Sequence, residues 1–219
     1  MQYTIRKYEA KDRKVVRWIC CETGFMGDPM EVYFEGREIF ADTWSRYWTD
    51  YELESAFVGE VDGVVVGYIL GCLDSEKQEK IFKEKIQPSL YRQAFFSTFF
   101  LHWKNLRYMR RVVRSWRRGE FNDPMKQVIA DYPAHLHTNI APAEFRGKGM
   151  GKALMTAYLD YLRGHKIKGV HLVTTSRSKM ALGLYYHMGF QKLFSGPLTC
   201  YDHVTSEPME KICLAMKLD

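Results

Sequence analysis

Residues 144–155, EFRGKGMGKALM, place three glycines and two lysines between an apolar stretch and a run with helical spacing. Gly147, Gly149 and Gly151 let the backbone adopt positive φ and approach a ligand closely. The helix that begins behind them offers free N–H groups and the positive end of its dipole, which together attract anions. This segment therefore predicts a strand–loop–helix unit, typical of an α/β layer, with an anion site in its turn.

Two common phosphate loops do not fit this segment. A P-loop needs GxxxxGK[ST], but Gly151 and Lys152 are followed by Ala153, and the first glycine position holds Arg146. A dinucleotide fingerprint needs GxGxxG, and a reading that starts at Gly149 reaches Leu154 where the last glycine should stand. The loop therefore belongs to neither class.

The remaining chain alternates strand and helix patterns on both sides of one interruption. Asp62-Gly63, between two β-branched runs, predicts a hairpin. Strands are expected over 2–10, 55–74 (the hairpin), 134–140, 169–175, 190–194 and 209–219, and helices over 11–26, 32–52, 151–165 and 179–190. We predict an α/β (α+β) fold, a mixed and mostly antiparallel central sheet with flanking helices. Residues 1–219 form a single domain with a basic helical insertion at about 75–130.

Composition narrows the classes of protein to which this chain can belong. A chain of 219 residues suits one sizeable core. No apolar run reaches the roughly 18–20 residues of a membrane span, and the charged start is no signal peptide. Five cysteines without a CxxC spacing predict free thiols and a cytoplasmic protein. The net charge of +6 is uneven, since the insertion is basic and residues 28–54 are acidic.

Two blocks of the sequence resemble the GCN5-related N-acetyltransferase (GNAT) family. RGKGMG, from Arg146 to Gly151, is similar to the [QR]-x-x-G-x-[GA] loop of that family and follows a strand and Pro142. The second block resembles N-x-x-A-x-x-L-Y-x-x-x-G-F through Ala181, Leu184, Tyr185, Gly189 and Phe190. The resemblance covers roughly residues 131–195. DYPAHLHTNI also resembles acetyltransferase-like domains attached to some O-GlcNAcases.

This resemblance implies the GNAT acyl-CoA N-acyltransferase fold and acetyl-CoA as co-substrate. The loop would bind the pyrophosphate of coenzyme A, and the splayed strand before it would pair its backbone with the pantetheine arm. Ser178 stands where the family has an asparagine that often contacts the same arm. The implied binding residues are Thr138, Asn139, Ile140, Arg146, Gly147, Lys148, Gly149, Met150, Gly151, Ser178 and Tyr185.

Acetyl transfer to an amine needs a proton donor for the thiolate and a base for the amine. Tyr185 matches the tyrosine that protonates the sulfur in the family; the alternative is a core aromatic. His135 and His137 lie on one face of a strand and are candidate bases, with Asp131 or a water as further candidates and two half-buried structural histidines as the alternative. Two histidines without a third ligand predict no metal site.

The acceptor is expected to be a primary amine on a small molecule or a protein. An acidic stretch rich in aromatic residues suits a cationic amine, unless it forms a core stripe and a solvated acidic face. Its aromatic residues are Tyr33, Phe34, Trp44, Tyr47 and Trp48, and its acids are Glu31, Glu35 and Glu38. The basic stretch Lys104–Arg118 caps the acceptor site, or else binds the 3′-phosphate, anionic lipid or nucleic acid; no nucleic-acid partner is expected. The predicted activity is direct N-acetyl transfer. The alternative is an inactive acyl-CoA-binding sensor or scaffold, and the oligomeric state, including a dimer, is open.

Overall fold

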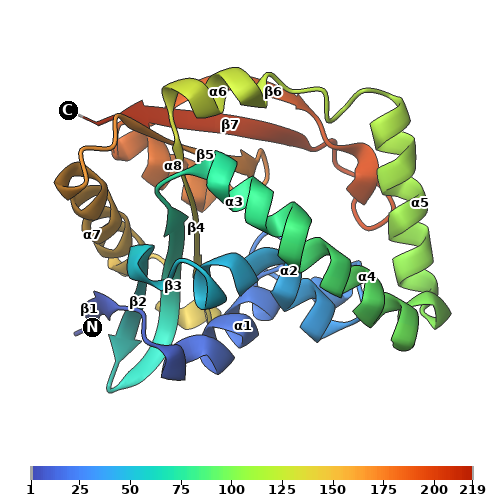
Figure 1. Ribbon diagram of the computed structural model, residues 1–219, viewed down its shortest axis with the longest axis horizontal. Coiled ribbons are helices and arrows are strands. Elements are labelled where there is room, and N and C mark those ends of the chain that lie inside the picture. The colour runs from blue at the N-terminus through green and yellow to red at the C-terminus, as the bar shows by residue number, and fades with distance from the viewer. Residues whose placement is uncertain (1, 219) are drawn as a thin grey trace.

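A mixed sheet of seven strands runs through the molecule, with helices on both of its faces (Figure 1). The computed structural model describes residues 2–218. Neighbouring strands are antiparallel except β4 and β5, and the strand order is β1-β2-β3-β4-β5-β7-β6. The strands are β1 (Thr4–Lys7), β2 (Ala56–Val61), β3 (Val64–Cys72), β4 (Ala134–Ile140), β5 (Gly169–Thr175), β6 (Gln191–Pro197) and β7 (Glu210–Lys217). This arrangement confirms the predicted fold class.

The hairpin β2–β3 is closed by the Asp-Gly pair that the sequence predicts. Asp62 and Gly63 have φ of 50° and 78°, and positive φ at both central residues defines the tight turn whose twist matches the flanking strands. The long strand β3 then pairs with β4 from Gly67 opposite Ile140 to Cys72 opposite His135. Residues directly opposite each other share one face of the sheet, so the odd-numbered side chains of β4 point the same way as Tyr68 and Cys72.

The two faces of the sheet are covered by different helices. α1 and α2 pack against β3 on one face, and α7 packs against β2, β3 and β4 on the other. Each helix buries an apolar stripe, and the buried side chains form one hydrophobic cluster on each face. The helices are α1 (Arg13–Glu22), α2 (Arg37–Asp50), α3 (Ser75–Ile81), α4 (Gln87–Phe96), α5 (Trp103–Arg117), α6 (Met125–Asp131), α7 (Met150–Gly164) and α8 (Lys179–His187).

The insertion between β3 and β4 forms a helical arm around the α2 side of the molecule (Figure 1). α3 continues into α4 through one π-helical turn, Phe82–Ile86, and α4 lies against α2. α5 then stands beside the short 3-10 turn Thr199–Tyr201 that follows β6. Asn105 connects this arm to the loop before α2, because its side-chain amide donates to the carbonyl oxygen of Glu35 and accepts from the Glu35 N–H.

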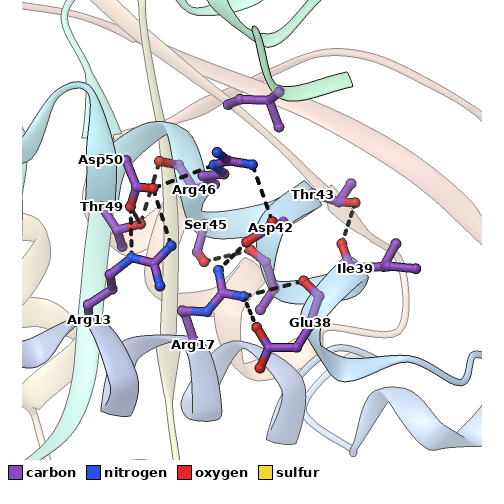
Figure 2. A network of polar contacts seen from close by, with 12 residues as sticks. Arg13, Arg17, Glu38, Ile39, Asp42, Thr43, Ser45, Arg46, Thr49 and Asp50 are labelled. Atoms are coloured by element: carbon purple, nitrogen blue, oxygen red, sulfur yellow. Dashed lines mark hydrogen bonds and ion pairs between the residues drawn. The ribbon is translucent and has the colours of Figure 1, made fainter. Parts of the chain in front are cut away.

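An ion-pair network holds α1 and α2 together (Figure 2). The guanidinium of Arg17, which is nearly buried, contacts the carboxylate of Asp42 at 2.5 Å and that of Glu38 at 2.6 Å. Arg13 pairs with Asp50 at 2.8 Å at the more exposed end of the same interface. These contacts satisfy charged groups that the α1–α2 interface would otherwise leave unpaired.

The five cysteines are all free and buried, as the sequence predicts. No helix within residues 2–218 combines the length and the apolar character that a membrane crossing requires.

Candidate functional site

The parallel strands β4 and β5 pair only at their beginnings. The ladder consists of Ala134 opposite Val170 and His135 opposite His171. Beyond these two pairs the strands separate, so the facing edges of 136–140 and 172–175 have no ladder partner within the described chain. Backbone N–H and C=O groups seek partners when they are withdrawn from water. The gap is therefore a place where a ligand can pair with main chain.

A cleft of about 710 Å³ opens at this separation. Strand residues from both sides of the gap line its middle. One end is formed by the loop before α7 and by the first turn of α8, and the other end by aromatic side chains from the α1–α2 side. Of the residues predicted for the site, those that line the cleft are His137, Thr138, Asn139, Ile140, Arg146, Gly147, Gly149, Gly151, Ser178 and Tyr185.

The glycine loop adopts the conformation that its sequence predicts. Gly147 and Gly149 have φ of 72° and 89°, which only glycine adopts at no steric cost. α7 begins at Met150, and its first intrahelical bond runs from the Ala153 N–H to the Gly149 carbonyl. The N–H groups before Ala153 have no helical acceptor, so this end of the cleft presents backbone donors and a helix dipole to an anion.

Arg146 has a structural role in this loop. Its Nε donates to the carbonyl of Ile140 at 2.8 Å, and a terminal nitrogen donates to the carbonyl of Gly27 at 2.8 Å. The guanidinium thus connects the end of β4 to the segment after α1. These segments lie far apart in the sequence, so no local pattern predicts the contact.

Three histidines from β4 and β5 form a cluster beside the cleft. The ring of His135 lies 4.7 Å from that of His137 and 5.0 Å from that of His171. Trp48 packs against His137 at 5.1 Å, and His171 bonds the carbonyl of Tyr132 through Nδ1 at 2.7 Å. Burial lowers the pKa of all three, that of His137 to about 4. The cluster is therefore neutral at pH 7.

Ser178 is the residue before α8, and Tyr185 lies about two turns further along that helix. Tyr185 is buried, and burial raises its pKa to about 12. The phenol therefore stays protonated at neutral pH and can donate a proton. Ser178 precedes α8, and its hydroxyl lies 3.1 Å from that of Thr175 at the end of β5.

Residues 125–213 match the acetyltransferase (GNAT) domain family. Within these residues, which are less than half of the chain, the sequence has the pattern of that family. No curated protein sequence is similar enough to this chain to match it. Among solved structures, a protein named SsHAT is 24% identical over the full length of both chains, with a TM-score of 0.75.

Two further structures resemble the whole chain at lower identity. YncA of Salmonella typhimurium, solved with acetyl-CoA, is 13% identical, with a TM-score of 0.58 over all of this chain and 95% of its own. A phosphinothricin acetyltransferase of Sinorhizobium meliloti, in complex with acetyl-CoA, is 15% identical, with the same TM-score over all of this chain and 89% of its own. These likenesses show that the GNAT fold extends over the full chain. The resemblance to O-GlcNAcase-attached domains stays a prediction.

Three residues predicted for the site contribute no side chain to the cleft. Met150 is fully buried, because its sulfur packs on the glycines Gly59 and Gly67 of the β2–β3 hairpin. Lys148 points to solvent at the crest of the loop. His135 stands behind His137, between the rings of His171 and Trp48.

The other candidates of the sequence analysis also lie away from the cleft. Asp131 is exposed at the end of α6. Phe34, Tyr47 and Trp48 are core residues, so among the aromatics named for the acceptor site only Tyr33 and Trp44 line the cleft.

A second group of cleft residues was not predicted from the sequence. These come from the end of α1, from β3 and from the turn after β6: Cys20, Thr23, Gly24, Phe25, Met26, Gly27, Tyr68 and Tyr201. Tyr68 accepts a hydrogen bond from the Asn139 amide at 2.8 Å, which fixes both side chains. Only the three-dimensional fold brings these segments to β4. Within residues 2–218 no three potential metal ligands converge.

Proposed function

We propose that this chain is an acetyl-CoA-dependent N-acetyltransferase that transfers the acetyl group directly to a primary amine. The observation that carries the proposal is the cleft between β4 and β5. It has free backbone donors and a helix N-terminus at one end and a protonated, buried tyrosine beside its middle. The complexes of the Salmonella and Sinorhizobium proteins with acetyl-CoA support the choice of co-substrate.

The fit of acetyl-CoA follows from groups of this chain. The loop from Arg146 to Gly151 offers N–H groups for the pyrophosphate, and its left-handed glycines leave no Cβ in the way. The free edge of β4 at Thr138 and Ile140 supplies main-chain partners for the amides of the pantetheine arm. The thioester then lies in the middle of the cleft, next to Tyr185.

The chemistry needs one bond made and one broken. The amine nitrogen attacks the thioester carbonyl, and the tetrahedral intermediate collapses as the C–S bond breaks. Tyr185 gives its proton to the leaving thiolate, while His137 or a water receives the proton of the amine. Cys20 lines the cleft, but burial raises its pKa to about 12. A thiol that stays protonated is a poor nucleophile, which favours direct transfer over an acetyl-enzyme.

Two variants test the proposal against the alternative of an inactive acyl-CoA-binding module, which Ser178 keeps open. Tyr185→Phe keeps the ring and removes the proton donor, so kcat should fall by roughly 10–10³-fold with little change in the Kd of acetyl-CoA. Gly149→Glu places a carboxylate at the phosphate position and should abolish acetyl-CoA binding. Gly149→Ala has the same backbone strain without the charge and is its control.

Titration calorimetry for acetyl-CoA and release of free thiol with a panel of amines separate the outcomes. Wild-type protein that binds acetyl-CoA but acetylates no amine identifies the binding module. Unchanged acetyl-CoA binding by Gly149→Glu removes the loop from the site.

A further inference from the structure

The charged groups that line the cleft are all basic. They are Arg146, Lys152, Arg177 and Lys179, and they lie at the end formed by the glycine loop and the first turn of α8. Among residues 2–218, no aspartate or glutamate lines the cleft. A cationic amine would therefore meet no carboxylate in this site, although ion pairing is the usual way in which a protein holds such a group.

Four carboxylates of the acidic stretch 31–42 have other partners. Glu38 and Asp42 bind Arg17 in the α1–α2 network (Figure 2). Glu31 pairs with Arg37 at 2.6 Å, and Glu35 pairs with Lys104 at 3.1 Å. The acidic stretch that the sequence offered for a cationic acceptor is thus used to fix α2 and the insertion.

A second part of the cleft lining, the aromatic end, consists of ring side chains. Phe25, Tyr33, Phe40, Trp44 and Tyr201 line it. Their rings hold one another in edge-to-face contacts, such as Tyr33 on Tyr201 at 5.0 Å. Trp44 is 43% exposed and stands 5.9 Å from the ring of His137, so it borders both the aromatic end and the candidate base. Such walls favour binding of a ligand that has a flat, weakly hydrated group.

The base available in this cleft suits the same kind of acceptor. An alkylammonium loses its proton with a pKa of about 10.4, whereas the half-buried His137 ring has a pKa of about 4. His137 is therefore weaker than an alkylamine by about six powers of ten. An amine that is already neutral needs a base only after attack, when its nitrogen has become strongly acidic.

We infer that the acceptor is a weakly basic amine, uncharged at neutral pH and attached to an aromatic or similarly flat apolar body, rather than a lysine side chain or a polyamine. This inference rests on the proposed N-acetyl transfer and adds the substrate class. The amine nitrogen bonds to the acetyl carbon, the C–S bond breaks, and the proton leaves through His137, so amide and free coenzyme A are the only products.

The test compares two probes of similar size, para-anisidine and benzylamine, at pH 7.5. The first is neutral at this pH, and the second is mostly cationic. We expect kcat/KM for para-anisidine to exceed that for benzylamine by at least about tenfold, because only the small neutral fraction of an alkylamine enters the site. Equal values, or a preference for benzylamine, overturn the inference and leave the proposed function standing.

Two variants at Trp44 provide a second test, which does not depend on which of the two amine probes the wild-type protein prefers. Trp44→Glu places a carboxylate beside His137 on an exposed helix position, whereas Trp44→Gln has the same shape without charge. We expect Trp44→Glu, but not Trp44→Gln, to raise kcat/KM for benzylamine by about fivefold, which corresponds to one charge pair about 4 Å apart in water. Equal effects of the two variants contradict the inference. Acetylation of other amines of the panel but of neither probe also overturns the inference. Acetyl-CoA binding without acetylation of any amine in the panel overturns the proposed function itself.

Discussion

The histidine cluster beside the cleft should make the protein sensitive to mild acid. His135, His137 and His171 are neutral in the folded protein because burial lowers their pKa. In the unfolded chain each ring has a pKa of about 6.5. Between these values the unfolded state binds more protons than the folded state, so stability falls as the pH drops. The loss should begin near pH 6.5, above the range in which most carboxylates titrate.

The size of the effect follows from the pKa of His137. A shift from 6.5 in the unfolded chain to about 4 in the fold corresponds at pH 5 to about 2 kcal/mol of lost unfolding free energy. His137→Gln removes this titration while it keeps a polar side chain of similar length. The variant should therefore lose about 2 kcal/mol less than the wild type between pH 7 and pH 5.

Urea denaturation at pH 7, 6 and 5 measures the difference directly. His102→Gln is the control, because His102 is exposed on the insertion and should leave the pH dependence of the wild type unchanged. Parallel loss of stability in wild type and His137→Gln would refute the reasoning. In that case the ring of His137 would not be withdrawn from water, and the argument for a weak base in the cleft would fail with it.

Three further predictions concern the frame around the cleft. Asp42→Asn should cost about 3 kcal/mol in urea denaturation, because it removes the buried partner of Arg17, whereas Asp50→Asn, at the exposed end of the network, should cost at most about 1 kcal/mol; equal losses contradict this ranking. Gly71→Ala should lower the melting temperature, since its Cβ would lie 2.1 Å from the ring of Tyr158 and overpacking costs about 1–3 kcal/mol; an unchanged melting temperature refutes that contact. Neutralising the arginines of the insertion should leave kcat/KM for acetyl transfer within about twofold, because none of them lines the cleft, and a collapse of acetyl-CoA affinity would place them in the site. The arginines concerned are Arg110, Arg111, Arg114, Arg117 and Arg118.

Much of the fold was predictable because the pattern of each element is local. The strands 134–140 and 169–175 have the predicted bounds, since both are short apolar runs bounded by proline, glycine or polar residues. The place of the last strand was not predictable. β7 lies between β5 and β6, and the sequence of a strand does not specify which strands it pairs with.

The same division separates the predictable and unpredictable parts of the site. The loop was visible because glycines at alternate positions encode a backbone shape. The partner of Asn139, Tyr68, was not visible, because 71 residues separate the two. The isolation of the Glu38 and Asp42 carboxylates from the cleft was equally hidden, because it depends on where Arg17 of α1 lies. Side-chain partners far apart in sequence are set only by the finished fold.

The short ladder between β4 and β5 also bears on how the site would respond to mutation. Any ligand that binds in the gap through its amides pairs with peptide groups, which every residue except proline carries in full. Replacing Thr138 or Val173 by alanine leaves those peptide groups in place. An alanine scan along the two strands would therefore change the binding of such a ligand little, although the gap is its binding site. Proline at the same positions would remove a donor and reveal it. A binding surface of this kind tolerates wide drift in the identities of its residues while its shape persists.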